Sequence, residues 1–281
     1  MPRKLTDDLV ARYRADGVLF PLPALDVAEA ESLLARLEAL EQAEGVQISR
    51  RTNHKPHLLL GWLADLIRDP RILDPVEDLI GPNIFCWGAD FFIKNPDDRK
   101  RVTWHQDSTY WGLSKRDIVT AWVAFTPSTV ASGCMRVVPG SHLKDQLPHR
   151  DTFAADNLLS RGQEIEVEVD EAAAVDVVLE PGQMSLHHVR LIHGSELNGS
   201  RNRRIGFAIR YIPTYVRQLN GMRDAATLVR GTDEFGHFSH EPRPNGDFDP
   251  DAVAFHAKVY ENQMDILYAG AGQRPDRAAR R

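Results

Sequence analysis

The first 80 residues place apolar side chains at three- and four-residue spacing, which is the period of an amphipathic α-helix. The opening helix is expected to begin at Thr6, a favoured N-cap residue followed by two aspartates, and to end at Gly17. A short strand is expected after it, and further helices are predicted over 28–44, about 58–67 and 72–80. Residues 1–80 are therefore predicted to be mainly helical.

Beyond residue 81 the pattern changes to short runs rich in Val, Ile, Phe and Trp, separated by turn residues. These runs follow one another without helical crossovers, so they favour a mainly β fold, an antiparallel sandwich or barrel. The predicted core spans 81–215. Its expected strands are 84–93, 102–110, 118–125, 135–138, 164–169, 184–193 and 203–212.

The last part of the sequence, 216–281, is predicted to hold a loop, a helix and a disordered tail. Gly, Pro and charged residues dominate 218–249, which we interpret as a loop with partial order. A helix is expected over about 250–268, and the tail GQRPDRAARR follows it. No internal repeat is visible and no clear linker divides the sequence, so a single domain over 1–281 is the preferred interpretation.

Composition narrows the class of protein. The chain has 281 residues, 42% of them apolar, with a formal net charge of −6 and a pI near 6.0. This balance fits a globular protein and predicts neither nucleic acid nor membrane as a partner. Two cysteines do not make a disulfide framework, and the N-terminus MPRKLTDDLV lacks the apolar run of a signal peptide. We therefore expect a soluble cytoplasmic protein.

The stretch TWHQDSTYW places His105 and Asp107 two residues apart. Chance alone supplies roughly 1.6 such pairs in a shuffled sequence with 11 His and 40 acidic residues, and a second pair occurs at His149 and Asp151. Residues i and i+2 of a strand share a face, so the first pair is predicted to point into the barrel, where a metal could partner both side chains. The second pair follows a proline and shows no strand pattern.

A third metal ligand is expected from a distant strand, and His193 is the best candidate. Two apolar runs flank Asn198 and Gly199, the dipeptide favoured in two-residue hairpin turns. If the turn is centred there, His193 lies directly opposite Arg204, and cross-strand partners share a face. Ser195 then shares that face as well. A longer loop or a bulge would change this register.

Three neighbours compete for these roles. In the assumed register His187 shares the face of His193 but lies too far along the strand to reach the metal. His188 faces the other side. Arg203 likewise points away from the face that carries Arg204 and is expected at the surface.

Two histidines and an aspartate with open coordination positions form the facial triad that holds iron in non-haem Fe(II) oxygenases. Such an iron needs a co-substrate that supplies electrons for the activation of O₂. Arginine suits a dicarboxylate co-substrate, because its guanidinium grips a carboxylate with two parallel hydrogen bonds.

Three motifs in this order carry a family resemblance: WHQD at 104–107, SGCMRVVPGSH at 132–142 and HGSELNGSRNRR at 193–204. They resemble the phytanoyl-CoA dioxygenase family of Fe(II)/2-oxoglutarate-dependent oxygenases. The similarity runs from about residue 8 to residue 215 and includes DGVLF and FFIKNP. The resemblance implies a double-stranded β-helix, a jelly roll of the cupin type with flanking helices, which agrees with the strand-rich pattern.

The resemblance also implies a role for each matched residue. His105, Asp107 and His193 match the iron ligands, and Arg204 matches the residue that binds the distal carboxylate of 2-oxoglutarate. The remaining co-substrate contacts match Ser195, beside Arg204, Trp122, which could equally be core, and Lys94, for which Asn95 could align instead. The implied cofactor is Fe(II), with 2-oxoglutarate and O₂ as co-substrates.

The implied activity is hydroxylation of an unactivated C–H bond of a small molecule, with release of succinate and CO₂. Related halogenases lack the carboxylate that Asp107 supplies, so its presence argues against halogenation. Desaturation, cyclisation and epimerisation use the same site and stay open. Two alternatives from other classes are a non-enzymatic cupin-like protein that binds a metal or a small ligand, and a zinc hydrolase.

The substrate is not indicated by any pattern, and no basic cluster can be assigned to the phosphates of coenzyme A. Candidate substrate contacts are Trp104, Tyr110, Trp111 and Arg136, although core packing explains the aromatic residues about as well. The loops 144–161 and 218–249 are expected to cover the mouth of the pocket. The expected assembly is a monomer or a homodimer.

Overall fold

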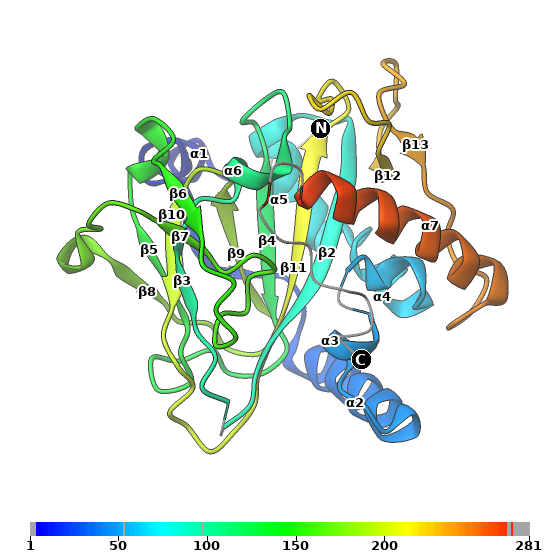
Figure 1. Cartoon of the computed structure of the whole chain (residues 1–281), viewed down its shortest axis with the longest axis horizontal. Helices are drawn as coiled ribbons and strands as arrows, with labels where there is room; N and C mark the ends of the chain where they lie inside the picture. The colour runs from blue at the N-terminus through cyan, green and yellow to red at the C-terminus, as the bar shows by residue number, and fades with distance from the viewer. Residues whose placement is uncertain (1–3, 53, 97, 269–270, 272–281) are drawn as a thin grey trace.

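Two β-sheets pack face to face and form a jelly roll (Figure 1). The computed structural model describes residues 4–52, 54–96, 98–268 and 271. The major sheet has the order β1-β9-β4-β11-β2-β12-β13, the minor sheet has the order β3-β10-β5-β8, and β6 pairs with β7. Every pair is antiparallel except β12 with β13.

The strands are short and, apart from β1, lie downstream of the N-terminal helices. Their bounds are β1 (Val18–Pro23), β2 (Ile84–Lys94), β3 (Val102–His105), β4 (Val119–Ala124), β5 (Met135–Val138), β6 (His149–Asp151), β7 (Gln163–Ile165), β8 (Val175–Val177), β9 (Gln183–His188), β10 (Ile192–Ser195), β11 (Arg204–Pro213), β12 (Ala225–Arg230) and β13 (Ser239–His240).

Most helices precede the sheets, and one closes the described chain. They are α1 (Asp7–Asp16), α2 (Val27–Glu44), α3 (Ile48–Arg51), η1 (Pro56–Leu58), α4 (Gly61–Leu66), α5 (Pro70–Ile80), α6 (Ser108–Trp111), η2 (Ser141–Leu143), η3 (Glu171–Ala173) and α7 (Pro250–Leu267). Among the described residues, no helix combines the length and apolar character needed to cross a membrane.

The predicted helix ends are confirmed at the N-terminus. The Thr6 hydroxyl accepts a hydrogen bond from the backbone N–H of Leu9, which satisfies one of the free donors of the first turn. Gly17 ends α1 with a φ of 77°, a left-handed conformation that glycine adopts without strain. The leucine-rich helix begins with a capping box at Asp26 and Glu29. The sequence signals at these helix ends are local, so they could be recognised without tertiary information.

The major sheet separates two apolar layers. Alternate residues of β4 and β11, such as Val123 and Phe207, face outwards and pack under α1, α2, α4 and α5. Their neighbours Trp122 and Ala208 face inwards and pack against Met135 and other residues of the minor sheet. The inner face therefore holds both core packing and the side chains that line the cavity described below.

Several predicted strand boundaries were wrong. The run 184–193 is divided into β9 and β10, which belong to different sheets, and the run 102–110 leaves the strand at His105 and turns into α6. Within 218–249, interpreted as loop, β12 and β13 extend the major sheet, and β6 lies within the predicted loop 144–161. These segments are short, and the partner strand that makes them strands is distant in sequence. The tail 272–281 lies outside the described residues.

A buried ion pair ties the segment before η1 to β12 and the residues after it. The Lys55 Nζ lies 2.5 Å from the Glu241 carboxylate and donates a second hydrogen bond to the backbone oxygen of Ala225. The other oxygen of Glu241 accepts from Thr227 and lies 3.5 Å from His57. Burial favours the neutral carboxyl, but Lys55 and His57 outweigh it and lower the pKa of Glu241 to about 2.

The buried pair of Lys55 and Glu241 predicts that the folded state becomes less stable in acid. A carboxyl whose pKa is lowered on folding stabilises the fold above its unfolded pKa of about 4.3, and that contribution is lost as the pH falls towards 2. We expect Glu241→Gln to cost about 3 kcal/mol at neutral pH, because Lys55 is left buried without a counter-charge. Urea unfolding at pH 7 and pH 3 measures this, and the difference between variant and wild type is expected to shrink at the lower pH.

The exposed pair between Glu29 and Arg71 supplies the matched control. Glu29→Gln is expected to leave the free energy of unfolding nearly unchanged, since solvent screens this pair. An equal loss in both variants, or a Glu241→Gln effect that does not depend on pH, would contradict the assignment.

Candidate metal centre and its cavity

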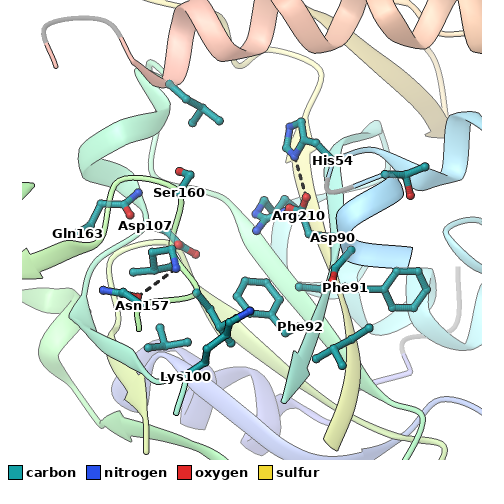
Figure 2. Close-up of a pocket in the computed structure, with 18 of the residues that line it drawn as sticks. His54, Asp90, Phe91, Phe92, Lys100, Asp107, Asn157, Ser160, Gln163 and Arg210 are labelled. Atoms are coloured by element: carbon teal, nitrogen blue, oxygen red, sulfur yellow. Dashed lines mark hydrogen bonds and ion pairs between the residues drawn. The ribbon is translucent and has the colours of Figure 1, made fainter. Parts of the chain in front are cut away.

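A cavity of about 1230 Å³ lies between the sheets. Residues of both sheets line it, together with residues from 46–52, His54, the segment 153–163 and one side of α7. Figure 2 shows Asp107, Asn157 and Gln163 on one side of this cavity and His54, Asp90 and Arg210 on the other. A space of this size accommodates a small organic molecule in addition to a co-substrate.

His105, Asp107 and His193 gather on one wall of the cavity, and one potential ligand atom from each lies within 4.8 Å of the others. His105 of β3 pairs directly with His193 of β10, and their ring centroids are 4.1 Å apart. All three side chains are largely buried. Two neutral donors and one anionic donor on the same wall match the ligand set of a divalent metal such as iron.

Local hydrogen bonds orient both imidazoles for metal binding. The Nδ1 atom of His105 lies 2.9 Å from the backbone oxygen of Thr103, and the Nδ1 atom of His193 lies 2.9 Å from that of Leu191. An Nδ1–H that donates to a carbonyl leaves the lone pair on Nε2 free for a metal. Burial and the neighbouring His105 lower the pKa of His193 to about 3, so its ring is neutral, as a ligand must be.

Asp107 reaches this wall by a different route from the predicted one. The strand ends at His105, and Asp107 adopts helical backbone angles (φ −60°, ψ −37°) at the N-terminal boundary of α6. The prediction that a strand aims both side chains inwards was therefore wrong for the aspartate. Its carboxylate still approaches His105, at 3.4 Å from Nε2. Burial would raise the pKa of Asp107, but the two histidines and Arg210 hold it below its usual range.

The predicted hairpin between His193 and Arg204 does not form. His193 lies in β10 of the minor sheet, whereas Arg204 lies in β11 of the major sheet, where it pairs with Lys94. The segment 196–203 is a longer connection between the two sheets, which removes the assumed register. Arg204, Ser195 and His193 nevertheless all line the same cavity.

Arg204 is a buried cation without a counter-charge in the described part of the chain. It is 2% exposed, its Nη1 donates to the backbone oxygen of Gly133 at 2.7 Å, and its Nε has no partner. Burial lowers the pKa of Arg204 to about 10. A buried guanidinium with donors to spare is costly unless an anion fills the space before it, so this end of the cavity fits a carboxylate ligand.

Lys94 is fully buried next to this end of the cavity. Its Nζ donates to the hydroxyl of Ser195 at 2.7 Å and to the backbone oxygen of Glu196. Burial and the charge of Arg204 lower the pKa of Lys94 to about 6. Lys94 does not line the cavity itself, so it positions Ser195.

Trp122 covers the guanidinium of Arg204, which lies 5.3 Å from the ring centroid, and its indole lies over Gly206 of the adjacent strand β11. A Cβ added at Gly206 would lie 1.9 Å from the indole ring. We expect Gly206→Ala to displace Trp122, to cost about 1–3 kcal/mol of stability and to weaken binding at the Arg204 end. Urea unfolding and the near-ultraviolet circular dichroism of the indole measure this. Gly246→Ala, where no atom lies within 4 Å, is the control and is expected to change neither.

The four candidate substrate contacts divide into two pairs. Tyr110 and Trp111 of α6 line the cavity. Trp104 and Arg136 do not, and the expectation that they border it was wrong. Arg136 stacks over Trp104 at 5.4 Å and forms an ion pair with Glu171. Trp104 is adjacent to His105 in β3, and successive strand residues point to opposite faces, so it lies on the far side of the minor sheet.

The second His-x-Asp pair is engaged elsewhere. His149 Nε2 accepts a hydrogen bond from the backbone N–H of Gln106, and Asp151 forms an ion pair with Arg161. The two residues lie in β6, although no strand was predicted there. Among the described residues, the metal-type cluster contains neither of them.

His187 lies closer to the metal wall than the assumed register placed it. Its ring centroid is 5.1 Å from that of His193, because β9 and β10 belong to facing sheets. His188 instead packs against His142 with the two rings tilted, outside the cavity. Arg203 forms an ion pair with Glu41, as expected for a residue that points away from the site.

Sequence reasoning missed a polar network opposite the metal wall. Asp90 accepts a hydrogen bond from Arg210 and lies 2.7 Å from His54 (Figure 2). The other ring nitrogen of His54 contacts Gln263 of α7. One signal was present. Asp90 and Arg210 interrupt the apolar runs of β2 and β11, and charged residues in central strands are rarely buried without a partner.

A buried cluster of two histidines and one carboxylate, here held by a jelly roll, is the metal-binding arrangement typical of non-haem Fe(II) oxygenases. Residues 13–206 match the model of the phytanoyl-CoA dioxygenase (PhyH) family. This match covers more than half of the chain, and the chain belongs to that family.

Known relatives agree with the assignment. A probable alpha-ketoglutarate-dependent hypophosphite dioxygenase of Stutzerimonas stutzeri is 29% identical over 174 residues, 60% of each chain. The chain thus spans less than two thirds of the length of this relative. Among solved structures, the apo non-heme monooxygenase ThoJ is 39% identical with a TM-score of 0.83, covering 95% of this chain and 100% of ThoJ. CytC3 with Fe(II) and alpha-ketoglutarate is 27% identical with a TM-score of 0.61, covering 83% and 91%.

Proposed function

We propose that this protein is an Fe(II)- and 2-oxoglutarate-dependent dioxygenase that hydroxylates an unactivated C–H bond of a small molecule. The observation that carries the proposal is the shared cavity, in which the His105–Asp107–His193 cluster and the unpaired Arg204 face the same space. The major sheet that supports this cavity contains strands from all three predicted parts of the chain, 1–80, 81–215 and 216–281. We therefore also propose that the chain forms a single oxygenase domain.

In this proposal, His105 and His193 bind the iron through Nε2, and Asp107 binds it through a carboxylate oxygen. When bound, iron and 2-oxoglutarate together supply the oxidation of the substrate by O₂, with release of succinate and CO₂. The protein supplies orientation. The two Nδ1 hydrogen bonds fix the imidazole planes, and the jelly roll keeps bulk water away from the buried cluster.

The co-substrate is held at the other end of the cavity. Arg204 would bind the distal carboxylate through its free N–H groups, and the Ser195 hydroxyl, positioned by Lys94, would donate to the same group. Trp122 closes the side of this pocket. CytC3 is 27% identical to this chain, and its structure with Fe(II) and alpha-ketoglutarate supports the choice of ligands.

Hydroxylation is favoured over halogenation because Asp107 occupies the third ligand position. A carboxylate there fills the position that a halide needs, and the three protein ligands leave the remaining positions for co-substrate and O₂. Product analysis by mass spectrometry distinguishes hydroxylation, a gain of one oxygen atom, from desaturation, cyclisation or epimerisation.

The direct test is succinate formation from 2-oxoglutarate in air, with Fe(II) and ascorbate, in the presence and absence of a panel of small molecules. We expect slow uncoupled turnover without substrate and faster turnover with an accepted one. A zinc hydrolase or a non-enzymatic binding protein would form no succinate under any of these conditions. Absence of succinate across the panel, in protein shown to bind Fe(II), would contradict the proposal.

A further inference from the structure

The inner face of the major sheet presents side chains to the cavity in successive rows. At one end, Arg204 pairs with Lys94, and two residues further along β11 is Gly206. The next row holds Trp122 beside Ala208. The rows therefore pass from the proposed co-substrate end of the cavity towards the opposite end.

The row beyond Trp122 is polar. Thr120 of β4 pairs with His187 on one side and with Arg210 on the other, so all three side chains project from the same face. All three line the cavity. The His187 ring is 5.1 Å from the ring of His193, which places this row next to the metal wall.

Two members of this row have unused hydrogen-bonding capacity. Thr120 and His187 are each 2% exposed, and neither the Thr120 hydroxyl nor the Nδ1 of His187 has a hydrogen-bond partner in the described chain. A buried polar group left unpaired costs about 1–3 kcal/mol. Native proteins rarely keep two such groups side by side unless a ligand or ordered water completes them.

The charge of Arg210 is already balanced. Its Nη1 donates to Asp90, which also contacts His54, and its guanidinium stacks over Trp111 at 5.4 Å. Arg210 therefore offers no uncompensated positive charge to an incoming carboxylate, in contrast to Arg204, so this row favours a neutral polar group.

We propose that Thr120 and His187 form a substrate subsite that binds a neutral group able to donate and accept hydrogen bonds, an amide or a hydroxyl, next to the carbon that is oxidised. This inference rests on the proposed function, which places the reacting carbon near the metal. A hydroxyl and an imidazole can each donate or accept, so together they complement such a group and disfavour a purely hydrocarbon or anionic one.

The test uses acetamide and acetate as probes of similar size, the first neutral and the second anionic. The protein is loaded with Mn(II) and 2-oxoglutarate under argon, and the paramagnetic relaxation of each probe's methyl protons is measured by NMR. We expect a clearly larger enhancement for acetamide. Thr120→Val and His187→Phe are each expected to lower it roughly five-fold, the loss of about one hydrogen bond, and Thr120→Ser is expected to retain it.

Thr214 supplies the matched control, because its hydroxyl is also buried and unpartnered but does not line the cavity. Thr214→Val is expected to leave the acetamide signal unchanged. A larger enhancement for acetate, or an acetamide signal that survives both Thr120→Val and His187→Phe, overturns the subsite. Saturation-transfer NMR without Mn(II) makes the same comparison between variants and does not depend on metal binding.

The subsite and the proposed function can fail separately. If Mn(II) and 2-oxoglutarate do not bind the wild type, the oxygenase proposal fails, and the saturation-transfer comparison still decides whether the row binds acetamide. If both bind and the variants leave the acetamide signal unchanged, only the subsite is rejected.

Discussion

Asp107→Ala is expected to reduce turnover of 2-oxoglutarate by more than about a hundredfold, since changes at groups that merely support metal ligands already cost 10–100-fold. The substitution removes the single anionic donor of the His105–Asp107–His193 cluster. Succinate formation measures turnover, and Mn(II) titration followed by electron paramagnetic resonance measures metal affinity. Both are expected to fall together, because the defect lies in binding the metal.

A pair of the same residue types outside the cavity serves as the control. His240 and Asp233 lie 3.0 Å apart, and neither residue lines the cavity. Asp233→Ala is expected to leave turnover and metal affinity unchanged. His193→Ala removes a ligand that lies in β10, a strand distant in sequence from α6. A matching loss of metal affinity in this variant shows that the Asp107→Ala defect is not a local folding defect in α6. Wild-type Mn(II) affinity in Asp107→Ala would exclude the aspartate as a ligand.

Arg204→Leu is expected to raise the KM for 2-oxoglutarate about a hundredfold, because truncating one partner of a buried charge pair costs 2–5 kcal/mol. The same change removes a buried cation that has no counter-charge in the described chain, so the melting temperature without 2-oxoglutarate is expected to stay the same or rise. A loss of affinity together with retained stability separates a binding role from a structural one.

The adjacent arginine makes a closely matched control. Arg203 pairs with Glu41 and points away from the cavity. Arg203→Leu is expected to leave the KM for 2-oxoglutarate unchanged and to lower stability slightly. If the two variants change the KM equally, the assignment of Arg204 to the distal carboxylate is wrong.

The two ends of the cavity present different side chains. Arg204, Ser195 and Trp122 form an end suited to the shared co-substrate. The opposite end is built from Thr120, His187 and the network of Asp90 and Arg210 with His54 and Gln263. That network reaches α7, which lies beyond the family match at residue 206 and contributes cavity residues from outside it.

Local features of the sequence were enough to predict the helix ends and the mainly β fold class. N-cap residues, a left-handed glycine and apolar spacing act within a few residues, so Thr6, Gly17 and the leucine-rich helix were predictable. The His-x-Asp motif with a distal histidine was also visible. His105, Asp107 and His193 were named from sequence, and the structure brings them together.

Only the tertiary structure decided how these residues meet. Strand pairing depends on partners distant in sequence, so the hairpin register that placed Arg204 opposite His193 was wrong although both residues line the cavity. Asp107 arrives from a helix boundary, and His187 approaches His193 from the facing sheet. The sequence by itself determined which side chains are available for chemistry. The packing of two sheets determined their distances, because it joins strands between which no local pattern exists.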